Sequence, residues 1–215
     1  MTKLLLPIFI FSFTFTYSQI HFEDISEASG IGEKGPNYGV AFGDYNNDGR
    51  EDIYVTRIGQ SNRLYQNQGN KTFIEVAAQA GVAHEGRTRM AVWGDINNDG
   101  WLDLFLANSK GQRDVLYLNH GDGTFEDISA SARMVSGGDG LAAMMGDIDN
   151  DGFLDIYVAR LGAENSLYRN QGNHTFVDII QSSGATDTRI AMGAVMFDYD
   201  NDRDLDIYLV HDNNQ

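Results

Sequence analysis

One acidic motif returns four times along the chain at almost equal intervals. Its first Asp is residue 44, 95, 147 or 198, so successive copies lie 51, 52 and 51 residues apart. A second segment, Leu-Tyr-x-Asn-x-Gly-x-x-Thr-Phe, follows the first three copies at residues 64–73, 116–125 and 167–176. Self-similarity at a fixed period of about 20–50 residues is typical of repeat architectures, in which each unit buries its apolar face against its neighbours. The chain is therefore expected to fold as a series of similar units.

The pattern inside each unit is that of short β-strands. In the first unit, residues 40–42 lead into the acidic motif, residues 52–56 leave it, and residues 63–67 and 72–76 flank a Gly-containing turn. Runs of β-branched and aromatic residues bounded by Gly, Asn and Asp predict strands joined as hairpins. Four antiparallel strands per period of about 50 residues predict the blade of a β-propeller. The predicted fold is all-β, a partial β-propeller of about four four-stranded blades. A β-solenoid is the alternative, although solenoid repeats are usually shorter.

Both ends of the chain carry incomplete units. Residues 21–26 nearly copy residues 124–129, so they predict a lone fourth strand before the first complete unit. Residues 212–215 stop before the expected Leu-Tyr strand of the fourth unit. We therefore expect residues 19–215 to form a repeat domain truncated at its C-terminus. Its unprotected blade edges would favour self-association.

Residues 1–18 have the features of a secretory signal peptide. A Lys at position 3 precedes an apolar run over residues 4–15, and residues 16–18 offer a cleavage site. The run is shorter than the roughly 20 residues that a spanning helix needs. A buried N-terminal strand is the alternative. The sequence thus predicts a secreted, extracellular protein with no transmembrane segment after cleavage.

Composition excludes several classes of protein and of site. The chain has no Cys, which rules out disulfides, a thiol catalyst and Cys-ligated zinc. With 31 acidic and 15 basic residues, its net charge is −16, which argues against binding to nucleic acid or to an anionic membrane. An exported protein without disulfides needs another stabilising cross-link, and a bound metal is one.

Each acidic motif places oxygen donors at alternate positions of a nine-residue loop. Calcium takes six to eight oxygen ligands, and side chains at positions 1, 3 and 5 converge if the chain curls. Gly at position 6 permits the turn, the position-7 carbonyl points inward, and Asp at position 9 completes the set. The loops at residues 44–52, 95–103, 147–155 and 198–206 therefore predict up to four Ca²⁺ sites. The candidate ligands at positions 1, 3, 5, 7 (by its carbonyl) and 9 are Asp44, Asn46, Asp48, Arg50 and Asp52; Asp95, Asn97, Asp99, Trp101 and Asp103; Asp147, Asp149, Asp151, Phe153 and Asp155; and Asp198, Asp200, Asp202, Asp204 and Asp206.

Alternatives to calcium explain less of the pattern. The loop resembles the first half of an EF-hand, but position 12 is Val or Leu in every copy and the flanks read as strands. Turn formation alone accounts for Asp, Asn and Gly in one loop, but it does not require Asp at position 9 of four loops. Magnesium prefers a strict octahedron with retained waters. In the fourth loop Arg203 replaces Gly at position 6, where we expect a left-handed backbone.

These loops and the Asn-x-Gly-x-x-Thr-Phe segments resemble the FG-GAP/VCBS family of repeats, as in the integrin α-subunit propeller. The chain is more similar still to the cartilage-acidic-protein-like group of extracellular repeat proteins. The resemblance covers nearly everything after residue 21 and implies a seven-bladed propeller with calcium in the loop between the first two strands of each blade. It departs where no Gly-Ala-Pro follows residues 42–43, and where Phe197 replaces the Gly that precedes the other loops. It implies extracellular binding or adhesion.

The function expected is therefore a non-enzymatic binding or adhesion module with structural calcium and an unknown extracellular protein or glycan ligand. A secreted propeller enzyme acting on carbohydrate and a structural spacer are the alternatives. The strongest non-repeated polar group is residues 84–89, which otherwise reads as an exposed loop. The residues just after each second strand are expected on one solvated face; they are Arg57, Asn108, Arg160 and His211. The residues just before each Gly-Asp or Phe-Asp pair are expected in the core; they are Phe42, Trp93, Met145 and Met196.

Overall fold

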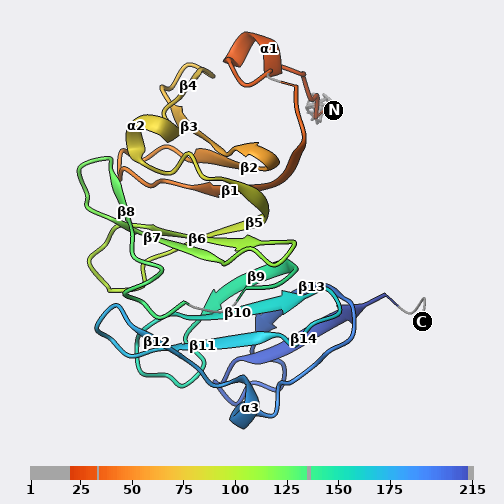
Figure 1. The fold of residues 1–215 in the computed structure, drawn as a ribbon. Helices are drawn as coiled ribbons and strands as arrows, with labels where there is room; N and C mark the ends of the chain where they lie inside the picture. Colours follow the sequence, from red (N-terminus) through yellow and green to blue (C-terminus); the bar gives the residue numbers. More distant parts are fainter. Residues whose placement is uncertain (1–19, 33, 135–136, 213–215) are drawn as a thin grey trace, which may run out of the picture.

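The computed structural model describes residues 20–32, 34–134 and 137–212, so the predicted signal peptide at residues 1–18 lies outside the described residues. It shows three four-stranded antiparallel blades and a two-stranded fourth unit, stacked along a curled path (Figure 1). The blades are β1 (Asn37–Gly43), β2 (Asp52–Ser61), β3 (Arg63–Asn67) and β4 (Phe73–Glu75); β5 (Glu85–Gly94), β6 (Asp103–Asn108), β7 (Val115–Asn119) and β8 (Phe125–Asp127); β9 (Gly140–Gly146), β10 (Asp155–Arg160), β11 (Ser166–Asn170) and β12 (Phe176–Asp178); and β13 (Ala191–Phe197) with β14 (Asp206–His211). The predicted all-β partial propeller is confirmed.

Within each blade, consecutive strands pair in chain order, and every acidic loop joins the first strand to the second. The register repeats, because the Gly before each of the first three loops lies opposite its position-9 Asp, as in Gly43↔Asp52 and Gly94↔Asp103. The first two blades are also joined directly. The end of β2 pairs with the start of β5, with Ser61 opposite Glu85.

The core consists of three apolar layers, each between two successive blades. All six residues of β6 and of β10 are buried, because a blade covers each face of these strands. In β14, by contrast, half-buried and exposed residues alternate, since one face is covered. Burial of apolar area between blades contributes roughly 25 cal/mol per Å² to the free energy of folding.

A large side chain and a Gly recur at each blade interface. A Cβ on Gly43 would lie 2.8 Å from the Trp93 ring, and one on Gly94 would lie 2.4 Å from Sδ of Met145. A Cβ on Gly146 would likewise meet Met196. The prediction that this position supplies core residues is therefore confirmed for the last three copies. It is wrong for Phe42, which is 62% exposed because none of the described residues forms a blade against its face.

Two features differ from the sequence-based expectation. The strand expected at residues 21–26 does not form, and Phe22 is 91% exposed, because the described chain offers this segment no third strand to pair with. Single helical turns follow this segment, β4 and β12, and were not predicted: α1 (Ser26–Ser29), α2 (Ala77–Ala80) and α3 (Ile180–Ser183). A left-handed Gly ends each turn, at Gly30, Gly81 and Gly184, as is common at helix C-termini.

No helix among the described residues has the length and apolarity needed to cross a bilayer.

Candidate metal-binding loops

All four acidic loops adopt the same backbone conformation. Position 4 is left-handed in every loop, with φ between 53° and 64° for an Asn in each case. Position 6 is left-handed as well, with φ of 82°, 89° and 91° at Gly49, Gly100 and Gly152. Arg203 takes this region too, with a φ of 80°, which confirms the expectation for the fourth loop. These two turns curl the chain so that positions 1, 3 and 5 lie on its inner side.

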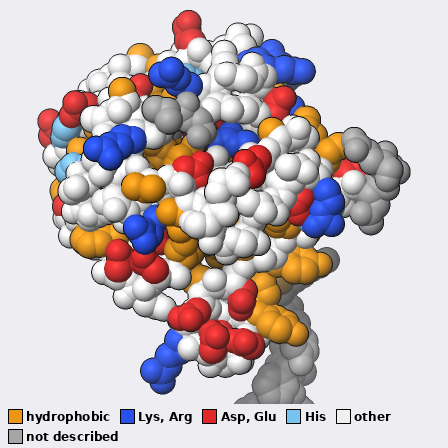
Figure 2. Space-filling model, turned by 60° about the horizontal axis from the view of Figure 1, so that its bottom comes forward, with side chains coloured by type: hydrophobic (Ala, Val, Ile, Leu, Met, Phe, Trp, Pro, Cys, Tyr) orange, Lys and Arg blue, Asp and Glu red, His pale blue; other side chains and the backbone are white. Residues whose placement is uncertain are grey.

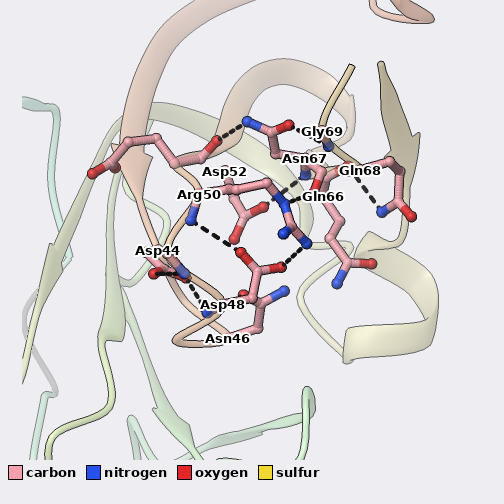
Figure 3. A network of polar contacts seen from close by, with 11 residues as sticks. Asp44, Asn46, Asp48, Arg50, Asp52, Gln66, Asn67, Gln68 and Gly69 are labelled. Atoms are coloured by element: carbon pink, nitrogen blue, oxygen red, sulfur yellow. Dashed lines mark hydrogen bonds and ion pairs between the residues drawn. The ribbon is translucent and has the colours of Figure 1, made fainter. Parts of the chain in front are cut away.

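Backbone amides inside each loop orient its first carboxylates. In the first loop, Oδ1 and Oδ2 of Asp44 accept the N–H groups of Asp48 and Gly49, over 3.0 and 2.7 Å (Figure 3). Oδ1 of Asp48 in turn accepts the N–H of Arg50 over 3.0 Å. The position-1 and position-5 bonds recur in the other loops. These hydrogen bonds orient the position-1 and position-5 carboxylates within each loop.

The position-9 aspartates of the first three loops lie deeper, at the start of the second strand, whereas Asp206 of the fourth loop is exposed. Asp52, Asp103 and Asp155 are at most 1% exposed. Asp103 accepts the N–H of Ile96 at Oδ2 over 3.0 Å and that of Asn119 at Oδ1 over 2.8 Å, and Asp155 is held in the same way. This residue therefore ties the acidic loop to the third strand, in addition to being a candidate ligand.

Burial and mutual repulsion make these carboxylates harder to ionise. Burial, with smaller contributions from Asp48 and Asp44, raises the pKa of Asp52 to about 6. Burial raises the pKa of Asp103 to about 7, and that of Asp155 also lies above its ordinary value. The pKa of the exposed Asp200 is raised mainly by the negative charge of Asp202. A cation bound between such groups would relieve both effects.

The structure brings carboxylates together most closely in the third and fourth loops. Oxygen atoms of Asp147, Asp149 and Asp151 lie within 4.8 Å of one another, and the same holds for Asp198, Asp200 and Asp206. Figure 2 shows a group of acidic side chains beside exposed hydrophobic ones on the face that it presents. All these donors are oxygens, the ligand type that suits calcium.

The candidate ligands of the first two loops carry less negative charge than those of the third and fourth loops, and one carboxylate in each already has a side-chain partner. In the first, Nη2 of Arg50 lies 2.5 Å from Oδ2 of Asp48, so a cation at position 7 already neutralises one candidate ligand (Figure 3). In the second, the side-chain amide of Asn97 donates to Oδ2 of Asp99 over 2.9 Å. Among the described residues, Oδ2 of Asp52 is nevertheless buried with no hydrogen bond of ordinary geometry, and such an atom fits a cation ligand.

In the second and third loops, the position-7 side chain packs against the neighbouring turn instead of facing the loop interior. A Cβ on Gly121 would lie 2.7 Å from the Trp101 ring, and one on Gly172 would lie 2.9 Å from the Phe153 ring. Each aromatic ring therefore covers the turn between the third and fourth strands of its blade. Their contribution to a metal site would come from the backbone carbonyl, as predicted from the sequence.

Sequence reasoning missed the asparagines that join neighbouring loops. Asn47 and Asn98, at position 4, donate to the carbonyls of Gly100 and Gly152, each over 2.8 Å. Asn119, at the end of β7, donates to carbonyls of both the first and the second loop. The signal was present, because Asn occupies position 4 of all four loops and tolerates a left-handed backbone.

The polar residues expected just after the second strands lie within β2 or at the ends of β6 and β10, and they do not form the solvated rim that was expected. Arg57, Asn108 and Arg160 are at most 5% exposed. The backbone N–H of each donates to a side-chain oxygen just before the third strand: Asn62, Asp114 and Asn165 accept them over 2.8, 2.9 and 2.8 Å. They stabilise the connection between strands because the buried amides need partners.

Residues 84–89 are also not the exposed loop that was expected. β5 begins at Glu85, and Arg87 pairs with Ile58 of β2. His84 is partly buried, its Nε2 lies 3.2 Å from Nδ2 of Asn108, and burial lowers its pKa. This segment is part of the contact between the first two blades.

Comparison with known proteins gives one family match. A model of the FG-GAP-like repeat matches residues 44–106, 95–158 and 147–209, and each stretch runs from position 1 of one loop to beyond the next loop. The chain is also 29% identical over 201 residues to Cartilage acidic protein 1 of Mus musculus and 28% identical over 201 residues to that of Homo sapiens. Integrin alpha-V of Gallus gallus is 28% identical over 174 residues.

These alignments cover most of the chain but a small part of each relative. They include 87% of this chain for the mouse and human proteins and 67% for the integrin. The chain spans 31%, 30% and 16% of the three relatives' own lengths. A solved Agrocybe aegerita lectin that recognises non-reducing terminal N-acetylglucosamine aligns with a TM-score of 0.49 and 20% identity, over 82% of this chain and 47% of that one.

Proposed function

The chain belongs to the FG-GAP-like repeat family, and on that basis we propose that it is a secreted calcium-binding propeller segment acting as an extracellular binding or adhesion module. The observation that carries the calcium proposal is the convergence of three carboxylates within 4.8 Å in the third loop and again in the fourth. Like charges at this distance repel unless they are protonated or share a cation.

Calcium suits these loops better than other common ions. The donors are carboxylate, amide and carbonyl oxygens on a loop curled by two left-handed residues, with no His among the candidate ligands and no Cys in the chain. Zinc and copper prefer nitrogen and sulfur, and magnesium favours a strict octahedron with retained waters. The residues that would hold the ion are those at positions 1, 3, 5 and 9, with the position-7 carbonyl. Up to four ions would neutralise much of the charge of the loops.

The role proposed for calcium is structural, and the module is proposed to be non-catalytic. Each loop is hydrogen-bonded to the next, so an ion in it would stiffen the stack of blades rather than meet a substrate. The predicted signal peptide and the resemblance to extracellular repeat proteins support export. The partner we propose is an extracellular protein or glycan rather than nucleic acid, because the chain carries a net charge of −16.

Thermal unfolding in calcium, in magnesium and in chelator tests this function. Binding to the folded state alone contributes RT ln(1 + [L]/Kd), about 1.4–2.7 kcal/mol per site at 10–100 times Kd. We expect the midpoint to be highest in calcium. Asp151→Asn should reduce the calcium-dependent shift, whereas Asp122→Asn, the same change in an exposed turn outside the loops, should leave it unchanged. Equal midpoints in all three solutions would exclude the proposed calcium sites.

A further inference from the structure

Neighbouring acidic loops contact one another through a residue that is not a candidate ligand. Nδ2 of Asn47 donates to the Gly100 carbonyl, and Nδ2 of Asn98 donates to the Gly152 carbonyl, each over 2.8 Å. Asn150 also reaches the following loop, but its acceptor is Oδ1 of Asp204, over 2.7 Å. Position 4 of one loop thus touches position 6 of the next in the first two pairs, and position 7 in the third pair.

The contacted peptide group also positions a candidate ligand. The Gly100 carbonyl and the Trp101 N–H belong to one planar peptide unit. That N–H donates to Oδ1 of Asp99 over 2.9 Å, and the N–H of Phe153 donates to Asp151 in the same way. The asparagine of one loop therefore orients the peptide that holds the position-5 carboxylate of the next loop.

A second asparagine connects the same pairs of loops. Nδ2 of Asn119 donates to the carbonyls of Tyr45, at position 2 of the first loop, and Leu102, at position 8 of the second, each over 2.9 Å. Asn170 makes the corresponding bonds between the second and third loops. Both asparagines are 2% exposed, so these bonds lie in the blade interfaces, where water competes little for them.

We propose that the first three loops bind calcium as a coupled set, in which an ion in one loop raises the affinity of the next through the position-4 asparagine. This inference rests on the proposed function, because the loops must bind the ion for coupling to exist. An ion held by positions 3 and 5 of the first loop orders the segment that carries Asn47, and with it the donor that orients the second loop. By thermodynamic linkage, an ion in the second loop favours the first equally.

Trp101 allows the second loop to be measured separately. It occupies position 7 of that loop, and Trp93 is the one other tryptophan in the sequence. Terbium(III), a hard cation with the oxygen preference of calcium, luminesces when a nearby excited tryptophan transfers energy to it. The part of the terbium signal that disappears in Trp101→Phe therefore reports occupancy of the second loop.

The experiment removes the ion from the first loop and measures the second by terbium titration of the full chain. Asp44→Ala should lower the second loop's terbium affinity about two- to tenfold, the range for one net hydrogen bond. Asn47→Gly, which keeps the left-handed backbone, should have the same effect, and adding Asp44→Ala to it should change nothing further. Asn201→Gly is the matched control, because this position-4 residue has a φ of 64° and its amide donates no hydrogen bond among the described residues.

The outcomes separate the coupling from the proposed function. If terbium binds the second loop with the same affinity in the unmodified chain, Asp44→Ala and Asn47→Gly, the coupling is wrong and the proposed metal binding stands. An equal loss of affinity in Asn201→Gly also overturns the coupling, since that side chain donates to no following loop among the described residues. If the unmodified chain gives no Trp101-dependent luminescence and calcium shifts no melting midpoint, both proposals fail.

Discussion

Arg160 of the third blade forms a buried ion pair with Asp114 of the second. Nη2 of Arg160 lies 2.8 Å from Oδ2 of Asp114, and the two side chains are 2% and 0% exposed. Asp114 also accepts the N–H of Asn108, and the Arg160 guanidinium donates to Oγ of Ser166. Burial raises the pKa of Asp114, whereas the positive charge of Arg160 opposes that shift. The ion pair joins two blades on the side of the strands away from the acidic loops.

We expect Asp114→Asn to destabilise the chain by about 3 kcal/mol, because it leaves the buried Arg160 charge without its partner. Asn is the residue found at this place in the first and third blades, at positions 62 and 165, so the acceptor for the Asn108 N–H is kept. Denaturant unfolding in excess calcium would measure the change.

The matched control is the double variant Asp114→Asn with Arg160→Met. It removes both charges, so most of the lost stability should return, whereas Arg160→Met alone should be destabilising. If the single and double variants lose the same free energy of unfolding, the cost comes from packing and the ion pair contributes little.

The sequence was sufficient to predict the blades and the loops, because both depend on local patterns. The regular spacing of the Asp residues predicted where the loops lie. Gly49, Gly100 and Gly152 predicted a left-handed turn at position 6, and Arg203 adopts the same left-handed backbone in the fourth loop. The strand expected at residues 21–26 was wrong, because a strand needs a neighbour and this segment has none among the described residues.

Contacts between blades could not be predicted in the same way. Phe42 has the pattern of a core residue, yet its burial depends on whether another blade covers it. The role of Asn47 requires two loops that are 53 residues apart in sequence to lie side by side. Periodicity predicts that such units stack, but it does not say which side chains cross between them.

The two outer blade faces are expected to make the chain self-associate. Val40 and Phe42 of β1 are 51% and 62% exposed, beside a cavity of about 240 Å³ that Ile31 and Tyr65 also line. At the other end, Tyr208 and Val210 of β14 are 61% and 52% exposed. Contiguous apolar surface of this kind favours association.

Light scattering after size exclusion, over a range of concentrations, should therefore show species larger than a monomer. Phe42→Ser should reduce this association, whereas Phe22→Ser should not, because Phe22 is 91% exposed but lies on no blade face. A monomer at all concentrations would contradict the prediction.

Stability without calcium should fall as the pH rises. The pKa values of Asp52 and Asp103 are raised from 3.8 to about 6 and about 7 in the folded chain. When folding raises the pKa of a carboxyl group, the group contributes its full stabilisation at pH values below its pKa in the unfolded chain. That contribution to the free energy of unfolding is lost as the pH rises through its pKa in the folded chain. In chelator, these two groups should therefore lower the melting midpoint between about pH 4 and pH 7.

Calcium should reverse this dependence, because the ion binds ionised carboxylates and competes with protons. The difference between the midpoints in calcium and in chelator should widen from pH 5 to pH 7.5. Asp103→Asn, which cannot ionise, should flatten the chelator profile, and Asp122→Asn in the exposed turn should not. A difference that stays constant with pH would show that these carboxylates are not coupled to calcium.

Arg203 should limit the affinity of the fourth loop. Its φ of 80° lies where a Cβ crowds the backbone, at a cost of roughly 1–2 kcal/mol that Gly avoids. The loop also has Asp at positions 1, 3, 5, 7 and 9, so electrostatic attraction for the ion opposes the strain. An exposed, screened charge such as Asp204 contributes below about 1 kcal/mol, and we therefore expect the backbone cost to dominate.

Arg203→Gly should accordingly bind calcium more tightly and raise the calcium-dependent melting midpoint, as calorimetric titration and thermal unfolding would show. The reciprocal change, Gly100→Arg, places the same side chain at the same position of the second loop, where φ is 89° and no heavy atom lies within 4 Å of an added Cβ. It should weaken terbium binding at that loop by a similar factor, because strain is the cost that the two changes share. Equal affinities in Arg203→Gly and the unmodified chain, together with an unaffected Gly100→Arg variant, would show that the left-handed turn at position 6 costs the loops no binding free energy.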